Sequence, residues 1–595
     1  GGGGVARVEE PAAADLKARG NARFKEGKFG EAFLAYSRAI ARMNLERLEE
    51  LQPPLDIATP QDVLDAAIPI PDDFDPALHA AALQDPETAD LFYALLANRA
   101  AVAARLGLFR RALTDVEAAL VVRPGDARAR LRKAQVLTRL QRYEEALEMW
   151  KELGGEFPKD RDVKKMADKV RRRMQEAGGV FDFFAVDSED TERAKLGAAL
   201  GGEEYADFVG PIEVVEIAGK GRGVVASHDI SKGTLLLCDR ALVVAASERR
   251  AETVAINERR QQLNTDSQIR AVSELVQRMK DDDEFARRVY NLHAGDAEKP
   301  PLDGEGKIPV DHLFVQSAVE FNAFRPQPIP RVADPVVGPS GGDTAGMTGV
   351  WSRASMFNHS CVPNTTRNSA GESLMIFATT DIREGEEITV AYCPKEASLA
   401  KRTDVCEQFG FRCTCELCEY QRTTASENIE LRGQLLEAWE EDIMPKLMKE
   451  SSTKALEPVL LFLDKLNTTY APDSPYEFEK VEILDLLGML YEEREQYSLA
   501  RQHYTRAYRA SGGRDPRFCK LVYRAIVCGS MDEFDESSAP ETERLLDELD
   551  ALYALRAGGD LVAAQRMVAR DVSISEAGGW DEDADEAERA RRMRK

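Results

Sequence analysis

The strongest constraint on the fold is a residue pattern that recurs along the first third of the chain. Five positions have counterparts 34 residues later: Gly107, Phe109, Ala112, Ala119 and Pro124 correspond to Gln141, Tyr143, Ala146, Leu153 and Pro158. An earlier copy with the same internal spacing contains Gly27, Phe29, Ala32 and Ala39. Small residues at regular positions let two helices approach closely, so this period predicts stacked helix pairs.

A 34-residue period with an aromatic residue after the turn resembles the tetratricopeptide repeat, or TPR. The first and second copies are offset by 80 residues, so 46 residues are inserted between them, at about 43–87. This insert contains seven prolines, and we expect it to be mostly irregular. Gly488, Tyr491, Tyr497, Ala500, Tyr504 and Ala507 repeat the spacing near the other end of the chain.

Between these helical regions the composition favours strands. Short runs such as IEVVEI, TLLLC, SLMIFA and EEITVAY alternate with turns rich in Gly and charged residues. Residues 252–290 are charged and predict a helix, and 325–349 are rich in Pro and Gly and predict a loop. We therefore expect an α+β multidomain protein with an N-terminal α-helical TPR solenoid, a central β-rich region and a C-terminal α-helical TPR-like domain.

The expected domain boundaries follow from these changes in composition. They are a disordered start at 1–12, a TPR domain at 13–160, a charged helix and linker at 161–210, a β-rich region at 211–420, a helical domain at 421–575 and a charged tail at 576–595.

The chain carries 79 Lys and Arg against 104 Asp and Glu, a net charge of −25. This balance argues against nucleic-acid binding as the main function, and an acidic surface would attract lysine-rich protein segments. The sequence shows no signal peptide and no run of about 18 apolar residues, so we expect no membrane partner. Four of nine cysteines lie within 13 residues, which in such a chain indicates metal binding and a reducing compartment, nucleus or cytoplasm.

Several short motifs occur in a fixed order: GKGRGV, EFNAF, NHSCVPN, EEITVAY and CTCELC. Together they resemble the SET-domain protein methyltransferases, specifically the SMYD-like branch, over about residues 211–420. The resemblance implies a protein-lysine N-methyltransferase that depends on S-adenosylmethionine. A histone tail and a non-histone protein are both possible substrates.

The cysteine motif predicts a structural zinc site. Cys413, Cys415 and Cys418 leave a tetrahedral zinc one ligand short, and Cys361 in the NHSC motif would supply the fourth. Four thiolates would close the coordination sphere, so this zinc would not be catalytic. The alternative is four reduced, buried thiols. Cys406 lies outside the tight motif. We expect packed thiols at the remaining cysteines, Cys393, Cys238, Cys519 and Cys528.

The resemblance also assigns a cofactor site and a substrate channel. The residues that would bind S-adenosylmethionine are Lys220 and Arg222 in the glycine-rich turn, Asn322, and the pair Asn358 and His359. Phe411 would stack on its adenine. Phe324 and Phe409 would line the channel for the target lysine. The family often has Tyr where Phe409 stands, so the number of methyl groups added is left open.

Tyr392, at the end of EEITVAY, is the expected catalytic residue. Methyl transfer to an amine is an in-line displacement, so alignment supplies much of the rate, and a tyrosine hydroxyl at the channel end can orient the amine. The alternative is an ordinary aromatic residue at the end of a strand. SMYD proteins usually carry a zinc-binding MYND module, but residues 242–310 contain no cysteine, so we expect that module to be absent.

The N-terminal repeats resemble TPR domains that bind the C-terminal peptide of heat-shock chaperones. The matching clamp positions are Lys17, Asn21, Asn98, Arg128 and Arg132. Donors on one concave face can hold a terminal carboxylate, whereas the alternative is a solvated polar face. A different class of function also fits the chain: a catalytically silent adaptor that binds protein tails through its helices.

Overall fold

The computed structural model describes residues 12–43, 85–183, 205–247, 255–257, 262–301, 308–326, 346–447, 452–531 and 539–577. The chain divides into two compact units. The first comprises residues 1–178 with 276–287 and 300–310, and the second comprises the remainder. No helix within the described ranges combines the length and apolar composition needed to cross a membrane.

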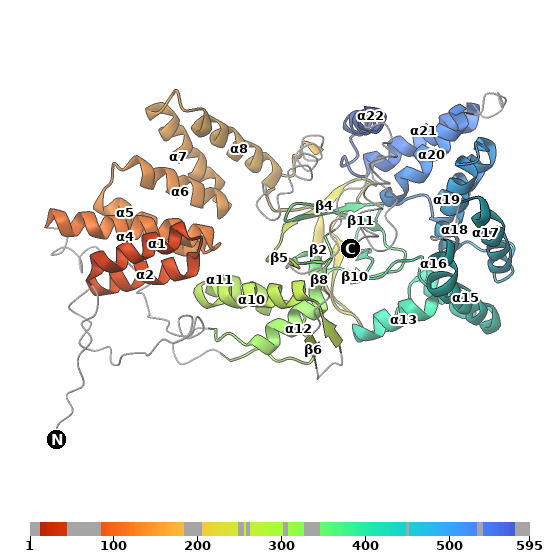
Figure 1. Ribbon diagram of the computed structural model, residues 1–595, viewed down its shortest axis with the longest axis horizontal. Helices are drawn as coiled ribbons and strands as arrows, with labels where there is room; N and C mark the ends of the chain where they lie inside the picture. The colour runs from red at the N-terminus through yellow and green to blue at the C-terminus, as the bar shows by residue number, and fades with distance from the viewer. Residues whose placement is uncertain are drawn as a thin grey trace, which may run out of the picture. The chain divides into compact units, whose positions relative to one another are not determined.

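The first unit contains a series of helix pairs (Figure 1, red to orange). Its helices are α1 (Ala13–Lys25), α2 (Phe29–Met43), α4 (Pro86–Arg105), α5 (Phe109–Val122), α6 (Ala127–Arg139), α7 (Tyr143–Glu156) and α8 (Arg161–Ala177). Phe109 and Tyr143, which are separated by the predicted period, begin α5 and α7. The prediction of stacked helix pairs is therefore confirmed.

The turn within each helix pair has the same backbone conformation. Gly27, Gly107 and Gln141 have φ values of 74°, 76° and 60°, and each lies two residues before an aromatic residue that begins the next helix. This left-handed region is open to glycine and costly for other residues, which explains why two of the three copies use glycine.

Small residues allow the helices of a pair to pack closely. Ala32, Ala39, Ala112 and Ala119 are fully buried at the helix crossings. A Cβ on Gly20 would lie 2.6 Å from the ring of Tyr36, so the glycine makes room for this tyrosine.

Eleven of the strands described in the second unit form three sheets that meet around a common core. The strands are β1 (Phe208–Val209), β2 (Ile212–Ile217), β3 (Gly221–Ala226), β4 (Leu235–Arg240), β5 (Val243–Ala246), β8 (Ala323–Phe324), β9 (Met347–Val350), β10 (Asn358–His359), β11 (Thr365–Ala370), β12 (Ser373–Ala378) and β13 (Glu387–Val390). The sheet orders are β1-β4-β12-β11, β10-β13-β3-β2 and β5-β9-β8. Trp351, Phe357 and Ile388 are fully buried in the core that these sheets share.

The charged segment 252–290 is only partly helical. A hairpin of β6 (Ala255–Asn257) and β7 (Gln262–Asn264) precedes α10 (Asp266–Asp281) and α11 (Asp283–Tyr290). The prediction of a helix was therefore wrong over the two strands, and in β7 an apolar residue between polar neighbours, Leu263, gives the alternation of a strand. Helix α12 (His312–Asn322) then leads into β8.

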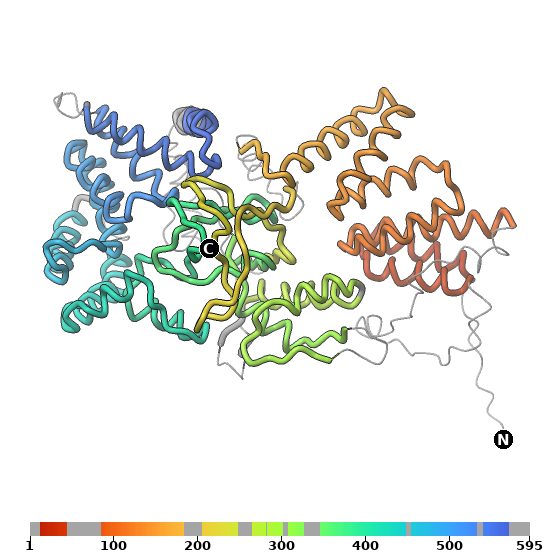
Figure 2. Tube along the Cα trace, turned by 180° about the vertical axis from the view of Figure 1, so that it is seen from behind, coloured from red at the N-terminus to blue at the C-terminus, as the bar shows by residue number. Residues whose placement is uncertain are grey.

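The C-terminal part of the second unit is helical (Figure 2, teal to blue). Its elements are α13 (Leu399–Gln408), α14 (Glu416–Thr423), α15 (Ser426–Ala438), η4 (Trp439–Ile443), α16 (Met444–Leu447), α17 (Ser452–Asn467), η5 (Phe478–Lys480), α18 (Val481–Glu492), α19 (Tyr497–Ala510), η6 (Pro516–Phe518), α20 (Cys519–Met531), α21 (Ala539–Ala554) and α22 (Leu561–Ala577). The pair α18/α19 repeats the N-terminal plan, since a Cβ on Gly488 would lie 2.5 Å from the Tyr504 ring.

Several expectations fall partly or wholly outside the described residues. These are the disordered start, most of the proline-rich insert, most of the loop at 325–349 and the charged tail.

Candidate active site

The two motifs at the centre of the site are joined by a short parallel strand pair. On β10, Asn358 lies opposite Thr389 and His359 lies opposite Val390 of β13. The chain leaves β13 directly into Ala391 and Tyr392, so the end of EEITVAY lies beside the NHSC segment.

Tyr392 is fixed to this segment at both ends. Its backbone N–H donates to Nδ1 of His359 at 2.9 Å, and its hydroxyl donates to the carbonyl oxygen of Phe357 at 2.8 Å. Burial raises the pKa of Tyr392 to about 12. The hydroxyl is therefore protonated at neutral pH, and it can hold a substrate group by hydrogen bonding but is not a general base.

The hydrogen bonds of His359 define its tautomer. A backbone N–H can only donate, so Nδ1 accepts from Tyr392, and the ring proton of the neutral imidazole then lies on Nε2. Nε2 is 3.3 Å from Sγ of Cys361 and 3.9 Å from Sγ of Cys393. His359 thus links the position of Tyr392 to the cysteine cluster.

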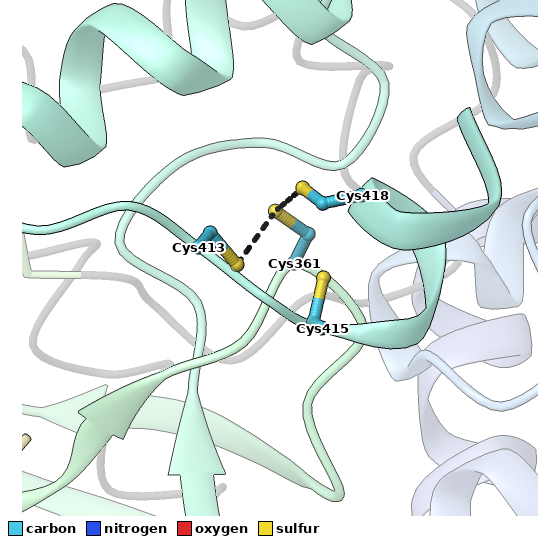
Figure 3. A group of neighbouring side chains, drawn as sticks. All are labelled: Cys361, Cys413, Cys415 and Cys418. Atoms are coloured by element: carbon cyan, nitrogen blue, oxygen red, sulfur yellow. Dashed lines mark hydrogen bonds between the residues drawn. The ribbon is translucent and has the colours of Figure 1, made fainter. Parts of the chain in front are cut away.

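The structure brings together the four cysteines predicted to bind zinc (Figure 3). Their sulfur atoms all lie within 4.8 Å of one another, and Sγ of Cys361 is 3.5 Å from that of Cys418 and 4.0 Å from that of Cys413. A tetrahedral zinc with bonds of about 2.3 Å requires sulfur atoms about 3.8 Å apart. The donor set and its spacing therefore fit zinc.

Two other cysteines lie close to this cluster. Cys393 forms a second possible group with His359 and Cys361. This group shares Cys361 and offers three ligands, whereas the four thiols complete a tetrahedron. Cys406 is buried beside the cluster but belongs to neither group.

Glu387 is a functional candidate that the sequence reading did not single out. Its carboxylate accepts from Nζ of Lys220 at 2.6 Å and from Nδ2 of Asn358 at 3.0 Å. Lys220 and Asn358 are two of the predicted cofactor ligands, so Glu387 joins the glycine-rich turn to β10. It lies in the quoted EEITVAY motif, but its partners are far away in the sequence.

The glycine of β3 leaves space for this arrangement. A Cβ on Gly223 would lie 2.5 Å from Nδ2 of Asn358 and 2.4 Å from Cδ1 of Ile217. Only glycine lets the Asn358 side chain approach the backbone of the turn here. Lys220, Asn358 and Glu387 thus form a hydrogen-bonded polar group at the expected cofactor position.

The other predicted cofactor ligands contact the protein itself. Arg222 donates to the carbonyl of Asn291 at 2.7 Å, and Nδ2 of the buried Asn322 donates to the carbonyls of His293 and Ala318 at 2.6 and 2.7 Å. Phe411 lies beside His359, with ring centroids 5.9 Å apart.

A cavity of about 710 Å³ opens beside Tyr392. Phe324 and Phe409, the predicted channel residues, both line it, and the rings of Tyr392 and Phe409 are 5.1 Å apart. The sequence reading missed Arg367 on β11, whose guanidinium lies 4.8 Å from the ring centroid of Phe324. Burial and the neighbouring charge of Arg517 lower the pKa of Arg367 to about 10, so it remains a cation.

In the first unit, two of the five predicted clamp residues bond to each other, and a third bonds to the backbone next to one of them. Nδ2 of Asn98 donates to Oδ1 of Asn21 at 3.2 Å, and Arg132 donates to the carbonyl of Ala97 at 2.6 Å. Lys17 shares a face of α1 with Asn21, and Arg128 shares a face of α6 with Arg132, because each pair is four residues apart.

Comparison with known proteins agrees with the geometry of the second unit. Residues 221–393 match the SET domain family. A "Methyltransferase" of Gibberella zeae is 24% identical over 58% of this chain and 49% of its own length. The "Protein-lysine N-trimethyltransferase SMYD5" of Gallus gallus is 32% identical over 16% and 26%, and the "Histone-lysine N-methyltransferase SMYD3" of Homo sapiens is 35% identical over 12% and 17%.

Residues 221–393 thus match a SET domain, and SMYD-type proteins are among the relatives that the chain resembles. The matched parts span about half or less of the length of these relatives.

Proposed function

We propose that this SET-domain chain is a protein-lysine N-methyltransferase that uses S-adenosylmethionine. The observation that carries the proposal is the protonated Tyr392 hydroxyl, held beside the NHSC segment at a cavity with aromatic walls. The SET domain match and the printed names of the relatives support this reaction class.

The chemistry of this polar group suits the cofactor. Asn358 and Lys220 carry hydrogen-bonding groups that Glu387 holds together, and the absent side chain of Gly223 leaves room for Asn358. S-adenosylmethionine would supply the methyl group on a positively charged sulfur. His359, in the NHSC segment, and Phe411, whose ring lies beside that of His359, would border the bound cofactor.

Tyr392 would align the reacting amine. Its hydroxyl proton is used by the carbonyl of Phe357, so the oxygen lone pairs remain to accept a hydrogen bond from the amine. The amine lone pair then forms the new N–C bond as the C–S bond breaks, and the excess proton leaves to water. Alignment of this kind supplies much of the rate of a displacement.

The target lysine must lose its proton before it reacts. Free lysine has a pKa of about 10.4, and an apolar environment or a nearby cation lowers that value. The walls formed by Phe324 and Phe409 provide the first effect, and the guanidinium of Arg367 provides the second.

The test is the Tyr392→Phe variant. We expect kcat to fall by about 10²–10³-fold, the range seen when one positioned hydrogen-bonding group is removed from an active site, with cofactor binding by calorimetry unchanged. Tyr523→Phe, at a half-buried tyrosine of α20, is the matched control and should retain full activity. Wild-type protein that neither binds the cofactor nor methylates any protein would favour the silent adaptor instead.

The four cysteines would hold a structural zinc that fixes the segment after β13 against the NHSC loop. Metal analysis should give one zinc per chain, and Cys415→Ser should reduce it, since three thiolates leave the tetrahedron incomplete. Retention of full zinc by a Cys413→Ser, Cys415→Ser variant would contradict this site.

The contact between Asn21 and Asn98, with Arg132 bonded to the adjacent Ala97 carbonyl, favours a second, separate function in the first unit: binding of a peptide C-terminus such as that of a chaperone. A peptide with a free acidic C-terminus should bind, and its amidated form should not. Arg128→Ala should weaken binding and Arg161→Ala, an exposed arginine at the start of α8, should not. Equal binding of both peptides would exclude a carboxylate clamp.

A further inference from the structure

The charge of the cavity beside Tyr392 is opposite to that of the whole chain. Its lining includes five cationic side chains and two carboxylates: Arg325, Arg367, Lys395, Arg514 and Arg517 against Glu416 and Asp515. The chain as a whole has a net charge of −25. The cavity is therefore a local basic region within an acidic protein.

One of the two carboxylates already forms ion pairs with cations of the same cavity. Asp515 lies 2.6 Å from Arg517 and 3.7 Å from Lys395. Burial opposes the ionisation of Asp515, but the charges of Arg517 and Lys395 outweigh it and lower its pKa to about 2. Lys395 also donates to the carbonyl of Ser511 at 2.7 Å, so this corner is fixed.

The remaining cations are arranged from the mouth of the cavity to its floor. Arg325, directly after β8, and Arg514, between α19 and η6, are exposed, and among the described residues neither forms an ion pair. Arg367 lies deeper, over Phe324. Exposed arginines can approach a carboxylate with two parallel hydrogen bonds.

We infer that this cavity selects proteins whose target lysine is flanked by acidic side chains. The inference rests on the proposed methyltransferase function and names its substrate class. The target lysine enters as a neutral amine, whereas flanking Asp or Glu side chains pair with Arg325 and Arg514 at the mouth. Additional lysines beside the target would meet these arginines and be repelled.

This inference reverses the expectation from overall composition. A charge of −25 suggests attraction of lysine-rich segments over long range, but the Debye length of about 8 Å at physiological salt limits that field. The residues in contact with the substrate then decide selection. A basic tail is disfavoured at the cavity even if it is drawn to the protein.

The experiment compares short peptides that share one central lysine and differ only in their flanking residues: acidic, neutral or basic. Wild-type protein should methylate the acidic peptide with kcat/KM about tenfold above that of the neutral one, and the basic peptide should be the poorest substrate. Binding of the same peptides in the presence of S-adenosylhomocysteine is measured separately by fluorescence anisotropy.

Charge reversal at the mouth tests the residues. Arg514→Glu and Arg325→Glu should each reduce kcat/KM for the acidic peptide by about tenfold and raise it for the basic peptide. Arg566→Glu makes the same charge change on an exposed residue of α22 outside the cavity, and should leave the peptide preference unchanged.

The outcomes separate the inference from the function on which it rests. Methylation without acidic preference, or with the same shift in Arg566→Glu, overturns the inference and leaves the function standing. No methylation, but acidic-peptide binding that depends on Arg514, supports acidic recognition by the cavity and contradicts the enzyme. Neither methylation nor binding overturns both.

Discussion

Helix pairs α4/α5 and α18/α19 each bury one aspartate, and they treat it in opposite ways. In the first unit, Asp115 of α5 accepts two hydrogen bonds from Arg99 of α4, at 2.8 and 2.5 Å. In the second unit, Oδ1 of Asp485 in α18 is buried without a hydrogen-bond partner among the described residues, and burial raises the pKa of this carboxyl to about 6.

The same helix-pair arrangement can therefore bury an aspartate either with a cationic partner or with an oxygen that lacks a hydrogen bond within the described part of the chain. The N-terminal pair neutralises its buried charge locally, because Arg99 holds the Asp115 carboxylate with two hydrogen bonds. The C-terminal pair keeps a carboxyl that titrates close to neutral pH. The segments flanking α18 and α19 supply Tyr476, Arg514 and Arg517 to the cavity beside Tyr392.

Breaking the Arg99–Asp115 pair should have the largest effect. Arg99→Met leaves the Asp115 carboxylate buried without its partner, which typically costs about 3–5 kcal/mol. Hydrogen exchange of α4 and α5 is the measurement, because a chain of two units does not unfold in one step. Arg105→Met, at an exposed residue of α4, is the control, and an equal cost for both would refute the comparison.

The second prediction concerns Asp485 and the pH. Its pKa is raised from 3.8 to about 6 in the fold, so its stabilising contribution is complete below about pH 4 and is lost as the pH rises through about 6. Asp485→Asn should therefore raise the free energy of unfolding by about 3 kcal/mol at pH 8 and change it little at pH 4.

Hydrogen exchange in α18 at both pH values measures this difference. Asp464→Asn, at an exposed aspartate of α17, makes the same chemical change without relieving a buried charge. An Asp485→Asn gain that is the same at pH 4 and pH 8 would show that the carboxyl does not titrate as expected.

The sequence was most informative where function depends on local spacing. The repeat period, the order of the SET motifs and the convergence of Cys361 with the CxCxxC segment were all predicted, since each is a pattern within a short segment or a motif with known order. The cations of the cavity beside Tyr392 were not predicted, because tertiary contacts bring them together. Lys220 and Glu387 are 167 residues apart, and Lys395 and Ser511 are 116 apart. No local pattern marks such pairs.

The third prediction concerns a glycine–tyrosine contact that the pairs α1/α2 and α18/α19 share. A Cβ at Gly20 or Gly488 would overlap a tyrosine ring, so alanine at either position should cost about 1–3 kcal/mol. Gly488→Ala should cost more, because the Tyr504 hydroxyl is held by Glu492 at 2.6 Å and Arg524 at 2.9 Å, which prevents the ring from moving. The Tyr36 hydroxyl has a neutral partner, Asn21, at 2.8 Å.

Hydrogen exchange of the affected helices measures these losses, with Gly433→Ala in α15 as the control. A Cβ there meets nothing within 4 Å, so alanine should stabilise the helix by a few tenths of a kcal/mol up to about 1 kcal/mol. A larger loss for Gly20→Ala than for Gly488→Ala would show that the tyrosine anchors do not set the rigidity of these crossings.

The smallest expected effect distinguishes the two turns that use a residue other than glycine. Gln141 and Glu495 have φ values of 60° and 58° in equivalent turns, where an L-residue with a side chain is strained by about 1–2 kcal/mol. Glycine removes the strain but adds freedom to the unfolded chain, so Glu495→Gly should gain about 0.5–1 kcal/mol. Gln141 is half-buried, and the loss of its side-chain contacts should make the gain at that turn smaller.

Glu493→Gly, where φ is −59°, is the control, since it has no strain to relieve and should destabilise the same helix end. If Glu495→Gly is as destabilising as Glu493→Gly, the left-handed turn is not a source of strain, and glycine at the equivalent Gly27 and Gly107 then needs a reason other than backbone conformation.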